Sequence, residues 1–155
     1  MSRLGVRWGC LVAAVLLAAG CAVRAPEEGF TPEPEAPGSR VIAPGPGTGA
    51  AVQRLLADAR KAARAGRVDQ AEVILERAVR IEPRNAVLWY YMARVQLHQG
   101  HTRQAEGLAA KSNSLAAGDR RLQADNWRII AHARAARGDL AGAQAAETRA
   151  AALAP

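Results

Sequence analysis

Residues 89–100 read WYYMARVQLHQG, and an earlier stretch, residues 71–83, reads AEVILERAVRIEP. In the earlier stretch the apolar residues Ala71, Leu75 and Ala78 are four and three positions apart, which places them on one face of an α-helix. The glycine that ends one stretch and the proline that ends the other are typical helix stops. The two stretches therefore predict two amphipathic helices.

The same pattern recurs along residues 50–155. Gly66, Gly100 and Gly138 each follow a segment of helix length, with spacings of 34 and 38 residues between them. An alanine stands five residues after each glycine, and a small residue stands seven positions further on. Small residues at fixed positions let neighbouring helices approach closely. The region is therefore expected to form three helical hairpins.

These residues and spacings resemble the tetratricopeptide repeat, a helix–turn–helix unit of about 34 residues. The resemblance implies an all-α solenoid in a domain over 50–155. It has about three repeats, at 52–85, 86–119 and 124–155, with expected helices at 50–65, 68–81, 85–99, 102–116, 122–137 and 140–153. The second repeat has four extra residues around 116–121, which predict a longer helix or a loop. Trp89 and Trp127 are expected to anchor the core.

Tetratricopeptide domains generally bind peptides or protein segments in the groove lined by their first helices. The resemblance places eight residues in such a groove: Gln53, Arg60, Arg64, Tyr90, Arg94, His98, Arg128 and His132. The four-residue steps from Tyr90 to Arg94 and His98 independently put these three on one helix face. Several arginines beside a tyrosine favour acidic or C-terminal carboxylate partners. A solvated arginine face that merely reflects an arginine-rich composition is the alternative.

The N-terminus predicts export and lipidation. Arg3 and Arg7 precede an apolar stretch, residues 9–20, that is too short to cross a bilayer as a helix. The residues AAGC at 18–21 resemble the lipobox of bacterial lipoproteins, which implies a signal peptide over 1–20 and a lipidated Cys21. Ala22, where an aspartate would favour the inner membrane, implies the periplasmic face of the outer membrane. The alternatives are an ordinary secretory signal and an uncleaved anchor.

Residues 21–49 link this N-terminus to the helical region. They contain six of the eight prolines and almost no apolar periodicity. Such a segment buries too little apolar surface to offset its ordering entropy, so a disordered spacer is expected. The chain's only other cysteine, Cys10, is lost with the signal peptide, so we expect no disulfide in the mature protein.

Enzymatic activity is not expected, because the sequence contains no catalytic constellation and no glycine-rich phosphate loop. No cofactor and no metal are predicted, since nothing near His98 and His101 completes a metal site. The net charge of +7 would suit nucleic acid in the cytoplasm, but export removes that partner.

The function predicted is that of an outer-membrane-anchored periplasmic adaptor that binds another envelope protein. Two alternatives stay open: an assembly factor similar to pilotin lipoproteins, and a structural lipoprotein that contacts peptidoglycan or lipopolysaccharide. The family usually ends with an extra solvating helix, which this chain lacks within 50–155. A marginal monomer, or a homodimer that covers this end, is therefore expected.

Overall fold

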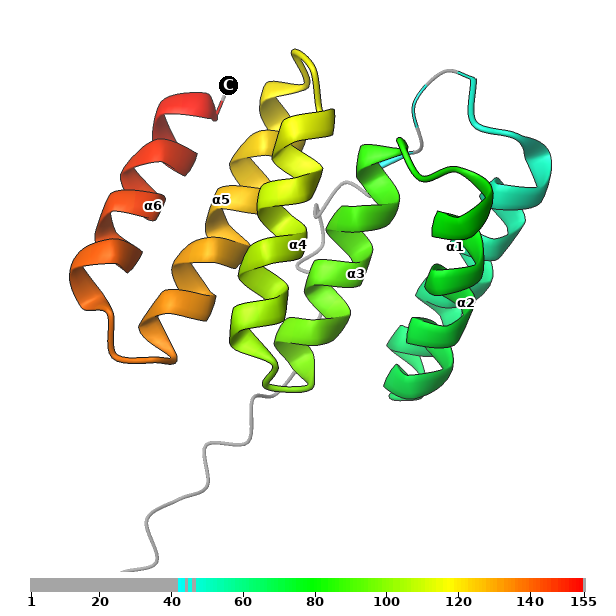
Figure 1. Cartoon of the computed structure of the whole chain (residues 1–155), viewed down its shortest axis with the longest axis horizontal. Helices are drawn as coiled ribbons and strands as arrows, with labels where there is room; N and C mark the ends of the chain where they lie inside the picture. The colour runs from blue at the N-terminus through cyan, green and yellow to red at the C-terminus, as the bar shows by residue number, and fades with distance from the viewer. Residues whose placement is uncertain (1–41, 44, 46, 155) are drawn as a thin grey trace, which may run out of the picture. The chain divides into compact units, whose positions relative to one another are not determined.

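The computed structural model describes residues 42–43, 45 and 47–154, and these residues form α-helices without any strand. The predicted signal peptide, Cys21 and most of the predicted linker lie outside the described residues. Six helices follow one another: α1 Ala50–Arg64, α2 Val68–Ile81, α3 Ala86–His98, α4 Thr102–Leu115, α5 Arg120–Ala135 and α6 Leu140–Leu153. They form three successive helical hairpins (Figure 1), which confirms the predicted all-α fold.

Each hairpin turn contains one of the three regularly spaced glycines. Gly66, Gly100 and Gly138 have φ values of +73°, +80° and +79°, a backbone conformation that side chains with a Cβ rarely adopt. The extra residues of the second repeat form a loop rather than a longer helix, because α4 ends at Leu115. Asp119 then caps α5, its carboxylate accepting from the Leu122 backbone N–H at 2.9 Å.

Contacts between hairpins run from the second helix of one to the first helix of the next. Helix α2 contacts α3, and α4 contacts α5. The first helices α3 and α5 also contact each other directly. This neighbour-to-neighbour packing is typical of a helical solenoid, in which each repeat completes the core of the next.

The centre of the core differs from the expectation based on tryptophan. Leu88 and Asn126, each directly before a predicted tryptophan anchor, are fully buried at 0% exposure. Trp89 and Trp127 are only partly buried. The Trp89 indole N–H donates to the Pro83 carbonyl at 2.7 Å, so its polar edge is held near the end of α2 rather than in the core. Trp127 still packs against the core cluster, as expected of an anchor, whereas Trp89 is not part of that cluster.

A buried polar chain joins helices α3, α4 and α5. The Asn126 amide of α5 donates to the Ser112 hydroxyl of α4 at 2.8 Å. That hydroxyl in turn donates to the Ala86 carbonyl of α3 at 2.9 Å. Both side chains are fully buried, so each needs these bonds to offset the loss of water.

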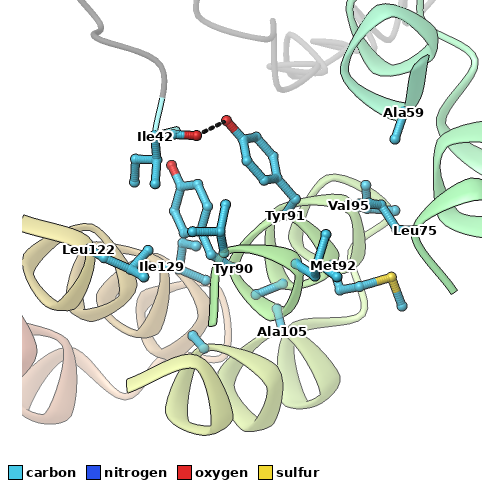
Figure 2. Packing of buried hydrophobic residues seen from close by; sticks show 14 of the residues in the cluster. Ile42, Ala59, Leu75, Tyr90, Tyr91, Met92, Val95, Ala105, Leu122 and Ile129 are labelled. Atoms are coloured by element: carbon cyan, nitrogen blue, oxygen red, sulfur yellow. Dashed lines mark hydrogen bonds between the residues drawn. The ribbon is translucent and has the colours of Figure 1, made fainter. Parts of the chain in front are cut away.

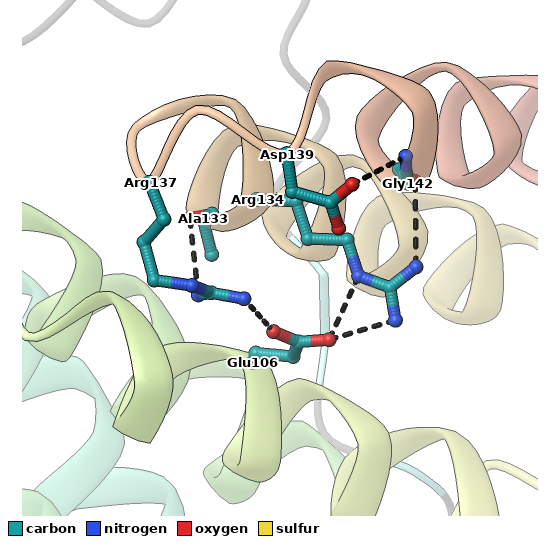
Figure 3. A network of polar contacts seen from close by, with 6 residues as sticks. All are labelled: Glu106, Ala133, Arg134, Arg137, Asp139 and Gly142. Carbon is teal, nitrogen blue, oxygen red and sulfur yellow. Dashed lines mark hydrogen bonds and ion pairs between the residues drawn. The ribbon is translucent and has the colours of Figure 1, made fainter.

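An ion-pair network holds the second and third hairpins together (Figure 3). The Glu106 carboxylate on α4 accepts from the Arg134 guanidinium at 2.8 Å, and its other oxygen accepts from Arg137. Arg134 also reaches the Gly142 carbonyl of α6 at 3.4 Å. Partial burial raises the pKa of Glu106, but the hydrogen bonds from Arg137 and Arg134 outweigh it and leave the pKa below its usual 4.5.

Glu106→Gln is expected to destabilise the domain by about 1 kcal/mol at pH 7, as for a partly exposed charged network. Because folding lowers the Glu106 pKa, its contribution is complete above pH 4.5 and is lost as the pH falls through the lower folded-state pKa. Urea unfolding of the unmodified protein and of Glu106→Gln at several pH values should show that their difference in free energy of unfolding shrinks below pH 4.5. Glu147→Gln, at an exposed carboxylate on α6, is the matched control. A difference that is constant with pH would contradict this assignment.

Candidate protein-binding site

Two tyrosines of α3 form the centre of the candidate site. The rings of Tyr90 and Tyr91 pack edge to face, with centroids 5.0 Å apart and planes at 72°. Each residue is only 8% exposed. Adjacent residues on a helix point about 100° apart, so the pair covers a broad part of this helix rather than a single stripe.

Two arginines lie over these rings. The Arg94 guanidinium is 5.8 Å from the centroid of Tyr90 and 6.0 Å from that of Tyr91. The Arg60 guanidinium, from α1, is 5.8 Å from the Tyr91 centroid. These distances fall within the range of cation–π attraction. We call Arg60, Tyr90, Tyr91 and Arg94 the tyrosine–arginine cluster; it joins the first helices of the first two hairpins.

The third hairpin adds charges at the edge of the cluster. Arg128 on α5 is paired with Asp125 at 2.5 Å. Burial raises the pKa of Tyr90 above its usual 10.0; Arg94 lowers it in part, and the Asp125 charge raises it further. Tyr90 is therefore a neutral phenol at physiological pH, able to donate a hydrogen bond to a carboxylate or carbonyl.

The structure thus brings three of the eight predicted groove residues together: Arg60, Tyr90 and Arg94. Arg64, His98 and His132 are exposed on α1, α3 and α5, and the Gln53 amide donates to the Thr48 carbonyl at 2.9 Å. The groove assignment of all eight stays a prediction. Tyr91 was missed because the four-residue register selects only Tyr90; the doubled tyrosine in the sequence was the available signal.

A residue from the predicted linker also contacts the cluster. Ile42 is 9% exposed and belongs to the buried hydrophobic cluster. Figure 2 shows it at the outer ends of the two tyrosine side chains, with the Tyr91 hydroxyl donating to its carbonyl at 3.4 Å. Sequence reasoning gave no reason to single out this residue, since it lies in a Pro/Gly-rich stretch without apolar periodicity.

The described residues offer no second kind of site. Histidine, cysteine and carboxylate side chains in this part of the chain do not gather in groups of three or more that could bind a metal ion. None of the six described helices has the length and apolar character that a membrane crossing requires.

Three successive hairpins, each with a glycine turn and small residues at the helix contacts, define a tetratricopeptide-repeat domain. The family model for the tetratricopeptide repeat matches residues 62–124. No curated protein matches the chain by sequence. The solved globular C-terminal domain of LpoP from P. aeruginosa is 40% identical, with a TM-score of 0.65, and the match covers 66% of this chain and 97% of that one. The chain therefore belongs to the tetratricopeptide-repeat family and is a relative of LpoP.

Proposed function

We propose that this protein is a lipid-anchored adaptor on the periplasmic face of the outer membrane, and that its repeat domain binds another envelope protein. The relationship to LpoP supports both the location and a protein partner. The observation that carries the proposal is the tyrosine–arginine cluster, because two helices supply cations that converge on one pair of rings.

The chemistry of the cluster favours an acidic segment of the partner. The Arg60 and Arg94 guanidinium groups lie over aromatic rings, and a guanidinium can also donate two parallel hydrogen bonds to a carboxylate. Arg94 is exposed although its neighbours on α3 are buried. Arginines that only reflected composition would be scattered over a solvated face, whereas Arg60 and Arg94 both lie over the tyrosine rings.

Replacing both cluster arginines should remove most of the partner from the complex. Arg60→Ala with Arg94→Ala deletes two charge-assisted contacts, so we expect recovery of the cross-linked partner to fall by about tenfold or more. The measurement is cross-linking in cells followed by affinity purification and mass spectrometry.

Arg77→Ala with Arg80→Ala is the matched control, because it removes the same charge from exposed positions on α2. Circular dichroism of both double variants should show the same helix content as the unmodified protein. An equal loss of partner in both variants would assign the effect to net charge, and no loss in either would place the binding site elsewhere.

A further inference from the structure

The tyrosine pair is covered by the protein's own chain. Ile42 has nearly all of its surface buried, although its neighbour Ala43 is exposed. The bond from the Tyr91 hydroxyl to the Ile42 carbonyl is long for a hydroxyl donor at 3.4 Å. Burial of the aliphatic side chain, rather than this bond, therefore carries the contact.

Thr48 and Gly49, directly before α1, are held by the loop that joins α2 to α3. The Gly49 backbone N–H donates to the Glu82 carboxylate at 2.7 Å. The Asn85 amide donates to the Thr48 hydroxyl at 3.1 Å, and to Glu82 at 2.8 Å. These bonds fix the point at which the chain enters α1, a few residues after Ile42.

We propose that the segment at Ile42 is a built-in ligand of the tyrosine–arginine cluster, and that a partner segment must displace it. This inference rests on the proposed function and specifies it. The partner segment would be an extended peptide that places one branched aliphatic side chain against Tyr90 and Tyr91, with a carboxylate beside Arg60 and Arg94. Because the cis segment closes the site, the apparent affinity for the partner equals the intrinsic affinity multiplied by the fraction of molecules in the open state.

The closure is tested on the full chain by hydroxyl-radical footprinting read by mass spectrometry. Ile42→Lys places a positive charge in the buried position at the arginine-containing cluster, so oxidation of Tyr90 and Tyr91 should rise several-fold. Ala43→Lys, which adds the same charge at the exposed neighbour, should leave both tyrosines protected. Met92, which lies on the other side of α3 (Figure 2), should stay protected in both variants and so reports an intact core.

A synthetic peptide then tests whether the segment is a true ligand. A short tether gives an effective concentration in the millimolar range, so the peptide of residues 38–47 is added at about 5 mM. It should restore tyrosine protection in the Ile42→Lys protein, and a peptide that itself carries Ile42→Lys should not. Unchanged tyrosine oxidation in Ile42→Lys, or equal rescue by both peptides, would overturn the proposal.

Competition with a partner is read from the cross-linking experiment described above. Partner recovery should rise by about tenfold in Ile42→Lys, and it should stay unchanged in Ala43→Lys. Exposed tyrosines without a gain in partner recovery would refute displacement while leaving the adaptor function in place. Loss of partner in Arg60→Ala with Arg94→Ala remains the separate test of that function.

Discussion

Leu88→Ala is expected to lower the free energy of unfolding by about 2–5 kcal/mol, the range for deleting a large aliphatic side chain from a packed core. Leu88 is fully buried on α3 and belongs to the hydrophobic core cluster. A domain of this size has only about 5–15 kcal/mol of stability in total, so the change should be visible as a large shift in the urea midpoint.

Leu140→Ala is the control for this experiment, because the same side chain is 71% exposed at the start of α6. It should change the midpoint little. Trp89→Ala should fall between the two, since the indole is partly exposed and its N–H bond to Pro83 is also lost. If Leu88→Ala were as mild as Leu140→Ala, the placement of the core between α3 and its neighbours would be incorrect.

Cys21→Ser is expected to abolish incorporation of radioactive palmitate and to release the protein from the membrane fraction. Each acyl chain contributes about 0.8 kcal/mol per buried methylene, so two chains hold a protein on a bilayer, whereas the helical domain alone should not remain there. Cys10→Ser is the control, because the predicted cleavage removes that residue. Labelling that persists in Cys21→Ser would end the lipoprotein interpretation.

The sequence predicted the helices to within about two residues because their boundaries have strong local causes. The expected helix at 85–99 is α3 at Ala86–His98, bounded by the Asn85 cap and the Gly100 turn. The extra residues at 116–121 left two outcomes open. Gly118, with φ +84°, helps to determine the result, because this conformation breaks a helix and suits a loop.

The core was harder to predict than the helices. Trp89 and Trp127 were expected to anchor the core. The fully buried residues are instead Leu88 and Asn126, each one position earlier in the sequence. A shift of one residue changes the direction of a side chain by about 100° around a helix. The small difference in register was therefore enough to move Trp89 and Trp127 toward the surface, where the Arg149 guanidinium lies 4.7 Å from the Trp127 ring.

The candidate site could be predicted only in part. Tyr90 and Arg94 follow from helix register, and Arg60 follows from the resemblance to the tetratricopeptide repeat. The pairing of Arg128 with Asp125 was not predicted. The contact of Ile42 with the cluster has no such periodic signal. It depends on where the chain runs before α1, which is determined by long-range bonds to Glu82 and Asn85.

The buried chain from Asn126 through Ser112 to Ala86 has a consequence for how the hairpins stack. Alanine-rich helix surfaces are smooth, so apolar packing alone would allow neighbouring helices to slide by a turn at little cost. Such a slip would leave the Asn126 amide and the Ser112 hydroxyl unpaired in the interior, at about 1–3 kcal/mol each. This pair of side chains therefore fixes the register in which the second and third repeats pack against each other.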